Sequence, residues 1–371
     1  MRSLDLGRRL LLGTLPALPT LCALIGTLAL FSLFLLMQGQ PAADALALIA
    51  QGAFGSSFAW QSTLLRAAPL MLTALCVALP AQVGLIVIGG EGALALGALA
   101  AAVVATLAPA GMPWFVASPL MAASGMLAGG LWIGAVGAMR QLRGVNETIG
   151  SLLMSYIAIA LFNHLVEGPL RDPASLNKPS TRPVPDALGI GSLPGLDVHW
   201  GLFWGALACV AAWVFVRHST KGFAMRIAGG NPHAAKLVGL PVNQLAIAAC
   251  AMGGAAAGLA GMFEVAAVQG SANASLLAGY GYAGILVAFA ARQNPLAIIL
   301  CAVLVGGIEA SGSLLQRRLG LPDATTLVLQ GLLFANLLAW ESMSGRLATW
   351  GVKLQRTPVT RLSVGLEGTH V

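Results

Sequence analysis

Charged residues are scarce in this sequence. Asp, Glu, Lys and Arg make up 9% of its 371 residues, whereas soluble domains carry about 25%. So few charges cannot solvate the surface of an ordinary globular domain, but a lipid bilayer tolerates an apolar exterior. Hydrophobic residues account for 57% of the chain and glycine for 46 residues, and small residues let membrane helices approach closely. The composition therefore predicts an all-α, polytopic transmembrane helical bundle.

Motifs for covalent chemistry are also missing. None of the lysines lies in the G-x-x-x-x-G-K-[ST] pattern of a nucleotide-binding P-loop. The patterns H-E-x-x-H and G-x-S-x-G and the Cys/His spacing of metal sites are absent as well. We therefore expect no catalytic residues, no metal ligands and no cofactor bound by this chain. Any ATP that drives it would bind to a partner subunit.

The cysteines and the basic residues each exclude a further class of protein. The five cysteines form no C-x-x-C pair and lie in apolar stretches, which favours small buried side chains over a disulfide framework. The net charge is +7, but the basic residues do not form one patch that could bind nucleic acid. They lie between apolar runs, as expected for the loops of a membrane protein.

Apolar runs long enough to cross a bilayer, at about 20 residues each, recur along the chain. Three of the predicted spans, the third, eighth and ninth, are rich in glycine or close to proline, so we expect broken or partly re-entrant helices there. Residues 1–345 would form the transmembrane domain and residues 346–371 a cytoplasmic tail. The ten predicted spans are 17–37, 62–82, 85–107, 113–139, 148–166, 199–216, 244–263, 274–291, 295–315 and 323–340.

Charge predicts the orientation of the chain. Ten spans place both termini on one side, and most Lys and Arg residues fall on that side if it is the cytoplasm, as the positive-inside rule requires. Arg317 and Arg318 are the exception. In this topology the proline-rich loop 167–198 is periplasmic and extended, and the basic loop 217–243 is cytoplasmic.

Within loop 217–243 the sequence predicts one short helix, Pro232–Leu237. Asn231 can cap its N-terminus, and Pro232 at the first helical position loses no hydrogen bond. Gly239 suits the end of a helix.

Two carboxylates lie within predicted spans and a third borders one, where a charge is costly unless it is paired, hydrated or protonated. Glu91 stands among glycines at positions 89, 90 and 92. It either lines a translocation path or accepts hydrogen bonds from backbone N–H groups that the glycines free. Glu264 lies near the outer end of its span, and Glu309 lies deeper. Glu147 follows Asn146 at the cytoplasmic edge, where an acidic residue favours a helix N-terminus.

Glycine pairs spaced four residues apart predict close helix packing within the chain rather than dimerisation. These pairs are Gly125–Gly129, Gly130–Gly134 and Gly254–Gly258.

Several stretches, in order along the chain, resemble one family of membrane proteins. Residues 145–158 (VNETIGSLLMSYIA) are similar to its VNEVIST…NYIA stretch, and residues 168–173 (GPLRDP) to GPLKDP. Residues 220–239, 256–264 and 279–296 resemble its T-x-GF…NPxAAxxxGI, LAGLAG…E and GyGF…NP segments. The family is the branched-chain amino acid, ribose and nucleoside type of ABC permease, and the resemblance is nearest to its nucleoside or simple-sugar branch.

This resemblance implies a permease subunit of a bacterial ABC importer in the inner (plasma) membrane. A second permease subunit, a paralogue or another copy of this chain, would complete the path, and an ABC ATPase subunit would dock on loop 217–243. A periplasmic or lipoprotein solute-binding protein would deliver a small polar solute, a nucleoside or a simple sugar. The residues implied in coupling are Lys221, Gly222, Arg226, Asn231, Pro232, Ala234, Ala235 and Gly239, with the two alanines as a small docking face. The candidates for the translocation path are Glu91, Asn146, Glu147, Glu264 and Asn294.

The sequence departs from the family around Glu91. The family usually reads FNIGxEGQ, whereas this chain reads IVIGGEGA, so Val87 and Ala93 replace Asn and Gln. The loss of two polar groups leaves the identity of the solute undetermined. It also favours a structural role for Glu91, and in that role Glu91→Gln should be tolerated. A gradient-driven secondary transporter that uses Glu91 and Glu309 is the alternative, but it would not need the basic pattern of loop 217–243.

Overall fold

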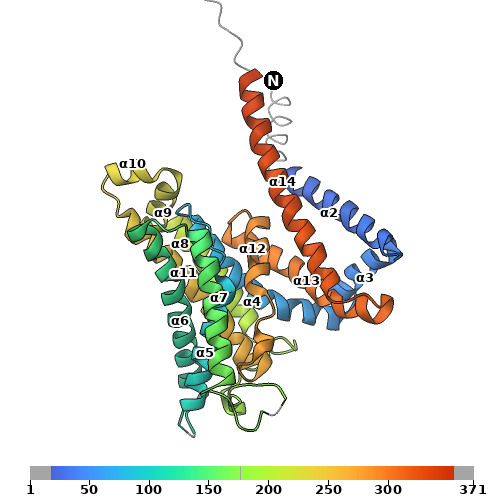
Figure 1. Ribbon diagram of the computed structural model, residues 1–371, viewed down its shortest axis with the longest axis vertical. Helices are drawn as coiled ribbons and strands as arrows, with labels where there is room; N and C mark the ends of the chain where they lie inside the picture. The colour runs from blue at the N-terminus through green and yellow to red at the C-terminus, as the bar shows by residue number, and fades with distance from the viewer. Residues whose placement is uncertain (1–17, 110, 176, 355–371) are drawn as a thin grey trace, which may run out of the picture.

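The computed structural model describes residues 18–354, except residues 110 and 176, and this part of the chain folds into helices without a named β-strand. Figure 1 shows most helices running along one direction, with α10 (Pro232–Leu237) at one end and the loop of residues 167–200 at the other. We call these the α10 end and the loop end. The start of α2 (Leu18–Met37) and the end of α14 (Ala324–Leu354) both point toward the α10 end (Figure 1).

The remaining elements follow the predicted spans, with a few additions. They are α3 (Ala42–Phe54), α4 (Ser57–Ala81), α5 (Gly90–Leu107), α6 (Trp114–Arg143), α7 (Glu147–Glu167), η1 (Asp186–Leu188), α8 (Gly201–His218), α9 (Thr220–Gly230), α11 (Val242–Phe263), η2 (Glu264–Gln269), η3 (Ala274–Leu276), α12 (Tyr280–Ala290) and α13 (Pro295–Leu319). Helices α3 and α9 were not predicted, because each is too short and too polar at its ends to read as a span.

The chain is a multi-pass membrane protein. In the part of the chain that the structure describes, seven helices are long and apolar enough to cross a membrane: α4, α5, α6, α7, α8, α11 with its extension η2, and α13. The apolar stretches of α2, α3, α12 and α14 are shorter, so the number of ten spans stays a prediction. Helix α14 continues past residue 346, where the tail was expected to begin. The rest of that tail and the N-terminal basic residues lie outside the described residues.

Two of the three spans expected to be broken are broken. Helix α5 begins only at Gly90, because residues 85–88 form no helix, and α12 is just 11 residues long, or about 16 Å. The expectation is wrong for α13, which is continuous from Pro295 to Leu319. Its proline occupies the first helical position, where no helical hydrogen bond is lost.

Glycine brings α5, α6 and α11 into backbone contact at the centre of the bundle. A methyl group on Gly258 would lie 2.0 Å from the carbonyl oxygen of Gly125, and one on Gly129 would lie 2.3 Å from that of Gly254. A methyl group on Gly97 of α5 would lie 2.3 Å from the Gly258 Cα. The predicted role of these glycines in packing within the chain is therefore confirmed. All five cysteines are free, and three of them are buried.

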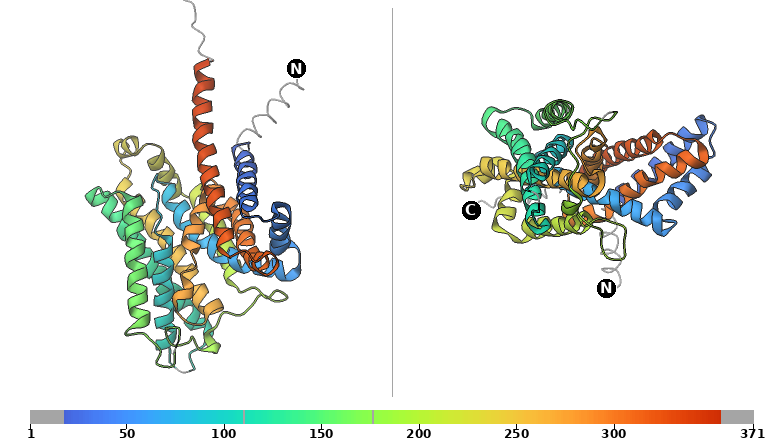
Figure 2. Two further views of the ribbon diagram at one scale, coloured as in Figure 1. Left: turned by 45° about the vertical axis from the view of Figure 1, so that its right-hand side comes forward. Right: turned by 90° about the horizontal axis from the view of Figure 1, so that it is seen from below.

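Three helices form an arm beside this bundle. Figure 2 shows α2, α3 and α14 grouped to one side, with α13 running between them and the bundle. The arm has its own apolar core, in which Phe31 and Leu35 of α2 pack with Ala45 of α3, Leu315 of α13 and Leu329 of α14. Helix α4 joins the two parts because it packs on α13, α11 and α12.

The described residues of the proline-rich loop that follow α7 form no regular helix beyond the single turn η1, as predicted, but turns at residues 168–170, 173–174 and 194–195 mean that the loop is not extended throughout. It runs antiparallel to the segment that follows α11. The Thr181 N–H donates to the carbonyl of Ala272 over 2.9 Å, and the Val184 N–H donates to that of Gly270 over 2.7 Å. The loop is thus fixed to the segment that leads into the short helix α12.

The glycine contacts predict that an alanine substitution lowers the melting temperature at a packed glycine but not at an open one. Gly258→Ala should lower the melting temperature of the purified protein in detergent, because the added methyl group overlaps backbone of α6 and overpacking costs about 1–3 kcal/mol. Gly331→Ala in α14 is the matched control, since a methyl group there meets no atom within 4 Å. It should leave the melting temperature unchanged or slightly higher. Equal melting temperatures for both variants would contradict the close packing.

Candidate functional site

The two broken helices meet at Glu91. Its carboxylate accepts one hydrogen bond from the Gly279 N–H over 2.9 Å and another from the Gly281 N–H over 2.6 Å. Glu91 lies in the first turn of α5, while Gly279 and Gly281 flank the first residue of α12, and the side chain is 1% exposed. The carboxylate thus caps the N-terminus of α12 from the N-terminus of α5. We call this arrangement the Glu91 cap.

Glycine and serine make the Glu91 cap possible. A methyl group on Gly281 would lie 2.1 Å from the Glu91 nitrogen, so only glycine allows α12 to approach α5. The start of α5 is held by α7, where the Ser151 hydroxyl accepts from the Ile88 N–H and the Ser155 hydroxyl accepts from the Gly92 N–H, each over 2.9 Å. Side chains of α7 therefore satisfy backbone N–H groups in and beside the irregular segment.

The electrostatics of the Glu91 cap favour the structural role. A helix N-terminus carries a partial positive charge and unpaired N–H groups, and here two N-termini face each other in an apolar bundle. A carboxylate between them compensates both, as anions do at helix N-termini. Non-helical backbone at membrane depth is tolerated only where its polar groups are satisfied or hydrated.

The five residues suggested for a translocation path are not brought together. Asn146 caps α7 by accepting from the N–H groups of Thr148 and Ile149, and Asn294 caps α13 by accepting from that of Leu296. Glu147 forms an ion pair with Arg140 over 3.2 Å. These three residues organise helix ends on the α10 side of the bundle, whereas Glu264 lies beyond α11 toward the loop end. For Asn146, Glu147 and Asn294 a role in a path stays a prediction.

The segment predicted to couple to an ATPase stands out from the bundle at the α10 end (Figure 1). The Asn231 side chain accepts from the Ala234 N–H over 3.0 Å at the start of α10, and Gly239 takes a positive φ of 82° after its end. The predicted helix, cap and stop are confirmed. Helix α9, which carries Lys221, Gly222 and Arg226, precedes it and is capped by Ser219.

The burial of Ala235 corrects one expectation about this segment, that both alanines face a partner. Ala235 was expected to present a small docking face, but it is fully buried against the bundle, in a cluster with Val242 and Leu245. Ala234 is exposed, and so are the two large apolar residues of this turn, Leu237, which is 88% exposed, and Val238, which is 73% exposed. Two large apolar side chains on the tip of a projecting loop indicate a contact surface. The alanine pattern of the sequence did not identify them.

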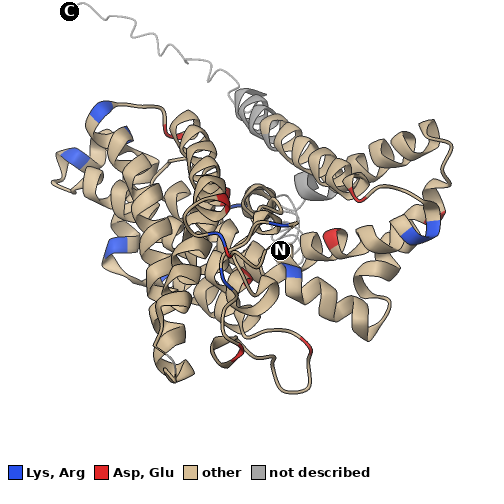
Figure 3. Cartoon of the chain, turned by 60° about the horizontal axis from the view of Figure 1, so that its bottom comes forward, with Lys and Arg blue, Asp and Glu red and all other residues tan. Residues whose placement is uncertain are grey.

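Sequence reasoning also missed a polar cluster where the arm meets the bundle. The Arg66 guanidinium of α4 lies 4.0 Å from the carboxylate of Glu309 in α13, and the Gln330 side chain of α14 donates to that carboxylate over 3.3 Å. Charged residues are few inside the bundle and gather mostly in loops and at helix ends (Figure 3). Arg66 lies in the predicted span 62–82 and Glu309 in the predicted span 295–315, but nothing in the sequence indicates that these two spans are neighbours.

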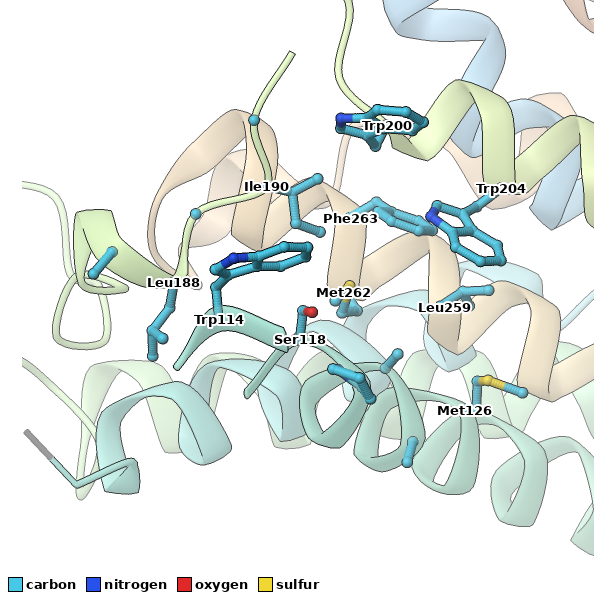
Figure 4. A pocket seen from close by; sticks show the side chains of 16 residues that line it. Trp114, Ser118, Met126, Leu188, Ile190, Trp200, Trp204, Leu259, Met262 and Phe263 are labelled. Carbon is cyan, nitrogen blue, oxygen red and sulfur yellow. The ribbon is translucent and has the colours of Figure 1, made fainter. Parts of the chain in front are cut away.

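A large cavity opens at the loop end, but its chemistry is apolar. It has a volume of about 990 Å³ and lies between the starts of α6 and α8, the end of α11 and the loop around η1. Trp114, Trp200, Trp204 and Phe263 surround it, and Ser118 contributes the hydroxyl shown in Figure 4. Such a lining suits hydrocarbon rather than a polar solute, which would need convergent hydrogen-bonding groups.

His199 lies just outside α8, behind this cavity. It is 4% exposed, its ring stacks on Phe263 at 6.4 Å, and its Nδ1 accepts from the Gly201 N–H over 3.0 Å. Burial lowers the pKa of His199 to about 4, so the neutral ring is the form that caps α8. In the described part of the chain no group of three or more His, Cys, Asp or Glu side chains could hold a metal ion.

The geometry of the Glu91 cap changes the expected effect of glutamine. Both carboxylate oxygens accept N–H bonds, so Glu91→Gln keeps one acceptor and turns an NH₂ group toward a backbone donor. An unsatisfied buried donor costs about 1–3 kcal/mol. We expect a lower melting temperature and less folded protein for Glu91→Gln than for the wild type, and a larger loss for Glu91→Ala.

Glu167→Gln, at the exposed end of α7, is the matched control for the charge. A Glu91→Gln variant with wild-type stability would refute the structural role. If that stable variant also failed to transport, Glu91 would belong to the path.

Comparison with known proteins identifies the chain. The family model described as branched-chain amino acid transport system, permease component, matches residues 59–338. The glucose ABC transporter permease protein of Haloferax volcanii is 32% identical over 338 residues, which cover 88% of this chain and 87% of that protein. The guanosine ABC transporter permease protein of Bacillus subtilis is 30% identical over 319 residues, which cover 82% and 87%. The chain belongs to the branched-chain amino acid transport permease family, in its simple-sugar and nucleoside type, and is the permease subunit of an ABC importer.

Proposed function

We propose that this chain forms the membrane path for a small, neutral, hydroxyl-rich solute, a nucleoside or a simple sugar. The observation that carries the proposal is the similarity, over most of the chain, to permeases named for glucose and for guanosine. These two solutes share a sugar unit with vicinal hydroxyl groups. The membrane is the bacterial inner membrane, and the α10 end faces the cytoplasm.

The orientation rests on charge and on the position of the chain ends. The described ends of α2 and α14 point to the same end of the bundle as α10 (Figure 1). The basic residues of loop 217–243 lie at this end, which agrees with the positive-inside rule. Loop 167–198 then faces the periplasm, where a periplasmic or lipoprotein solute-binding protein docks.

A separate ATPase subunit supplies the energy and docks on the α9–α10 region. Leu237 and Val238 insert into the ATPase, while Ala235 fixes α10 to the bundle. When the ATPases close on ATP, this contact moves the helices that follow α10, and the path opens alternately to each side. A second permease subunit, a paralogue or another copy of this chain, forms the other wall of the path.

The proposal is tested by uptake into vesicles that hold the complete transporter. ATP should drive accumulation of labelled guanosine, ribose or glucose, and collapse of proton and sodium gradients by ionophores should leave the rate unchanged. A secondary transporter would behave in the opposite way. Uptake that needs an ion gradient and ignores ATP would refute the proposal.

The exposed apolar residues at the end of α10, Leu237 and Val238, predict which substitution separates ATP hydrolysis from transport. Leu237→Ser should reduce ATP-driven uptake at least tenfold and reduce copurification of the ATPase, because a buried leucine contributes about 1.5–3 kcal/mol to an interface. The fold should be unaffected, since Leu237 is 88% exposed.

Leu107→Ser is the matched control, because Leu107 is 76% exposed but lies at the end of α5. It should leave the amount of copurified ATPase unchanged. Full uptake and normal ATPase binding by Leu237→Ser would exclude this contact.

A further inference from the structure

A small polar pocket lies where the arm meets the start of α4. It is formed by the end of α3, the first turns of α4 and the last turns of α13, and its volume is about 190 Å³. Drug-sized ligands occupy about 300–1,000 Å³, so this pocket suits one small group rather than a whole nucleoside or sugar. Its polar lining residues are Gln51, Ser56, Ser62, Ser313 and Arg317.

The pocket carries one positive charge. Arg317 lines it, and no Asp or Glu does. Among the described residues Arg317 forms no ion pair, since both ion pairs found there involve other arginines. Glu309, about two turns before it on α13, is paired with Arg66. The guanidinium of Arg317 therefore has N–H donors available for an anion, and the Gln51 amide and the Ser62 hydroxyl are donors in the same lining.

The position of Arg317 along α13 places the pocket at the membrane surface. Arg317 follows Pro295, the first residue of this apolar helix, by 22 residues, which is about 33 Å along the helix axis. The hydrocarbon core of a bilayer is about 30 Å thick, so Arg317 lies at the level of the lipid headgroups. The start of α4 reaches the same surface, because the Gln61 amide donates to Asp197 of loop 167–198 over 3.4 Å.

The dipole of α13 does not account for Arg317. Basic side chains favour the C-terminus of a helix, and both Arg317 and Arg318 lie in the last turn of α13. Both are exposed, but only Arg317 lines the pocket. One arginine would serve the dipole, and two of them at the end opposite α10 are the exception to the positive-inside rule. This positive charge therefore calls for a partner of opposite sign.

The pocket is apolar on one side. Phe58, which is 72% exposed, and Leu314 line it beside the polar residues. In the same turn of α4, Trp60 is 45% exposed and packs on Phe54 with the ring centroids 4.8 Å apart. Exposed aromatic rings are typical of a membrane interface. Polar donors beside exposed apolar rings match a molecule that joins an anionic group to hydrocarbon, whereas a free inorganic anion would leave the rings without a partner.

We propose that this pocket binds the phosphate group of an anionic phospholipid from the leaflet at the loop end. The planar guanidinium of Arg317 donates two N–H bonds to phosphate oxygens, and Gln51 and Ser62 donate to the remaining oxygens. The N-terminus of α4, which Ser56 caps, attracts an anion, and the C-terminus of α3 repels it. The charge of Arg317 therefore decides the sign of the ligand.

The bound lipid connects the arm to the bundle. Gln51 belongs to α3, Ser62 to α4 and Arg317 to α13, so one phosphate group contacts a helix of the arm, a helix of the bundle and the helix between them. In the orientation proposed above this is the periplasmic leaflet. The site does not depend on which solute the permease transports.

Native mass spectrometry of the full-length chain, delipidated in detergent and titrated with phosphatidylglycerol, tests this site. The wild type should retain one phosphatidylglycerol molecule more tightly than any other. Arg317→Gln should weaken the retention of this molecule about tenfold, because charge-assisted hydrogen bonds to phosphate are strong. Arg318→Gln is the matched control, since it removes the same charge from the same helical turn but outside the pocket. It should retain the lipid as the wild type does.

Two further measurements test the geometry and the source of the phosphate group. Arg317→Lys keeps the charge but loses the planar fork, so it should retain the lipid less tightly than the wild type and more tightly than Arg317→Gln. Inorganic phosphate at the same concentration as the lipid should not displace it, because inorganic phosphate makes no contact with the apolar side of the pocket.

Each outcome decides the inference. Equal retention by the wild type and Arg317→Gln, or an equal loss in Arg317→Gln and Arg318→Gln, would overturn the site. Displacement of the lipid by an equal concentration of inorganic phosphate would identify a free-anion site and overturn the lipid. If the melting curve shows that Arg317→Gln does not fold, Ser62→Ala decides instead: retention should fall about threefold with the loss of one hydrogen bond, and unchanged retention would overturn the proposal. These measurements involve neither solute nor ATP, so their failure leaves the proposed function intact.

Discussion

The hydrogen bonds from two backbone amides to the Glu91 carboxylate are the constraint on which this membrane fold depends. Both α5 and α12 begin inside the bundle, so each exposes unpaired N–H groups and a positive dipole where water is scarce. One carboxylate satisfies α12 directly, over 2.9 and 2.6 Å, and neutralises both ends. Without it, two facing helix N-termini would repel each other. The glycine at position 281 follows from this contact, because a side chain there would overlap α5.

The Glu91 cap also connects the regions that transport must move together. On one side Gly279 and Gly281 bracket Tyr280, whose backbone carbonyl accepts from the Thr73 hydroxyl of α4 over 3.0 Å. On the other side the chain before Gly279 is tied to loop 167–198, from Ala266 to Ala272. A solute-binding protein that moves the loop would therefore move the start of α12. The α10 end, where we propose that an ATPase docks, is joined to the same bundle through Ala235 and α11.

Much of the fold could be predicted from the sequence, because apolar length indicates where membrane helices lie and glycine spacing indicates where they pack closely, although the number of ten spans stays a prediction. The short helix α10 was predicted to the residue, since Asn231, Pro232 and Gly239 are local signals whose meaning does not depend on distant contacts. Glu91 was singled out, but its partners were not, because Gly279 and Gly281 lie almost 200 residues away. Ala235 was expected to face a partner but is buried, since six residues are too few to define the buried face of a helix. Arg66 with Glu309 was missed because only the packing of α4 on α13 brings them together.

Amide hydrogen exchange at residues 279–282 tests the Glu91 cap most directly. In wild-type protein in lipid nanodiscs these amides should exchange slowly, at a rate close to that of the packed glycine region around residue 258. In Glu91→Gln, residues 279–282 should exchange at least tenfold faster while the region around 258 is unchanged, because only the start of α12 loses its acceptor. Equal exchange at residues 279–282 in both proteins would contradict the account, since the carboxylate would then not hold the two broken helices together.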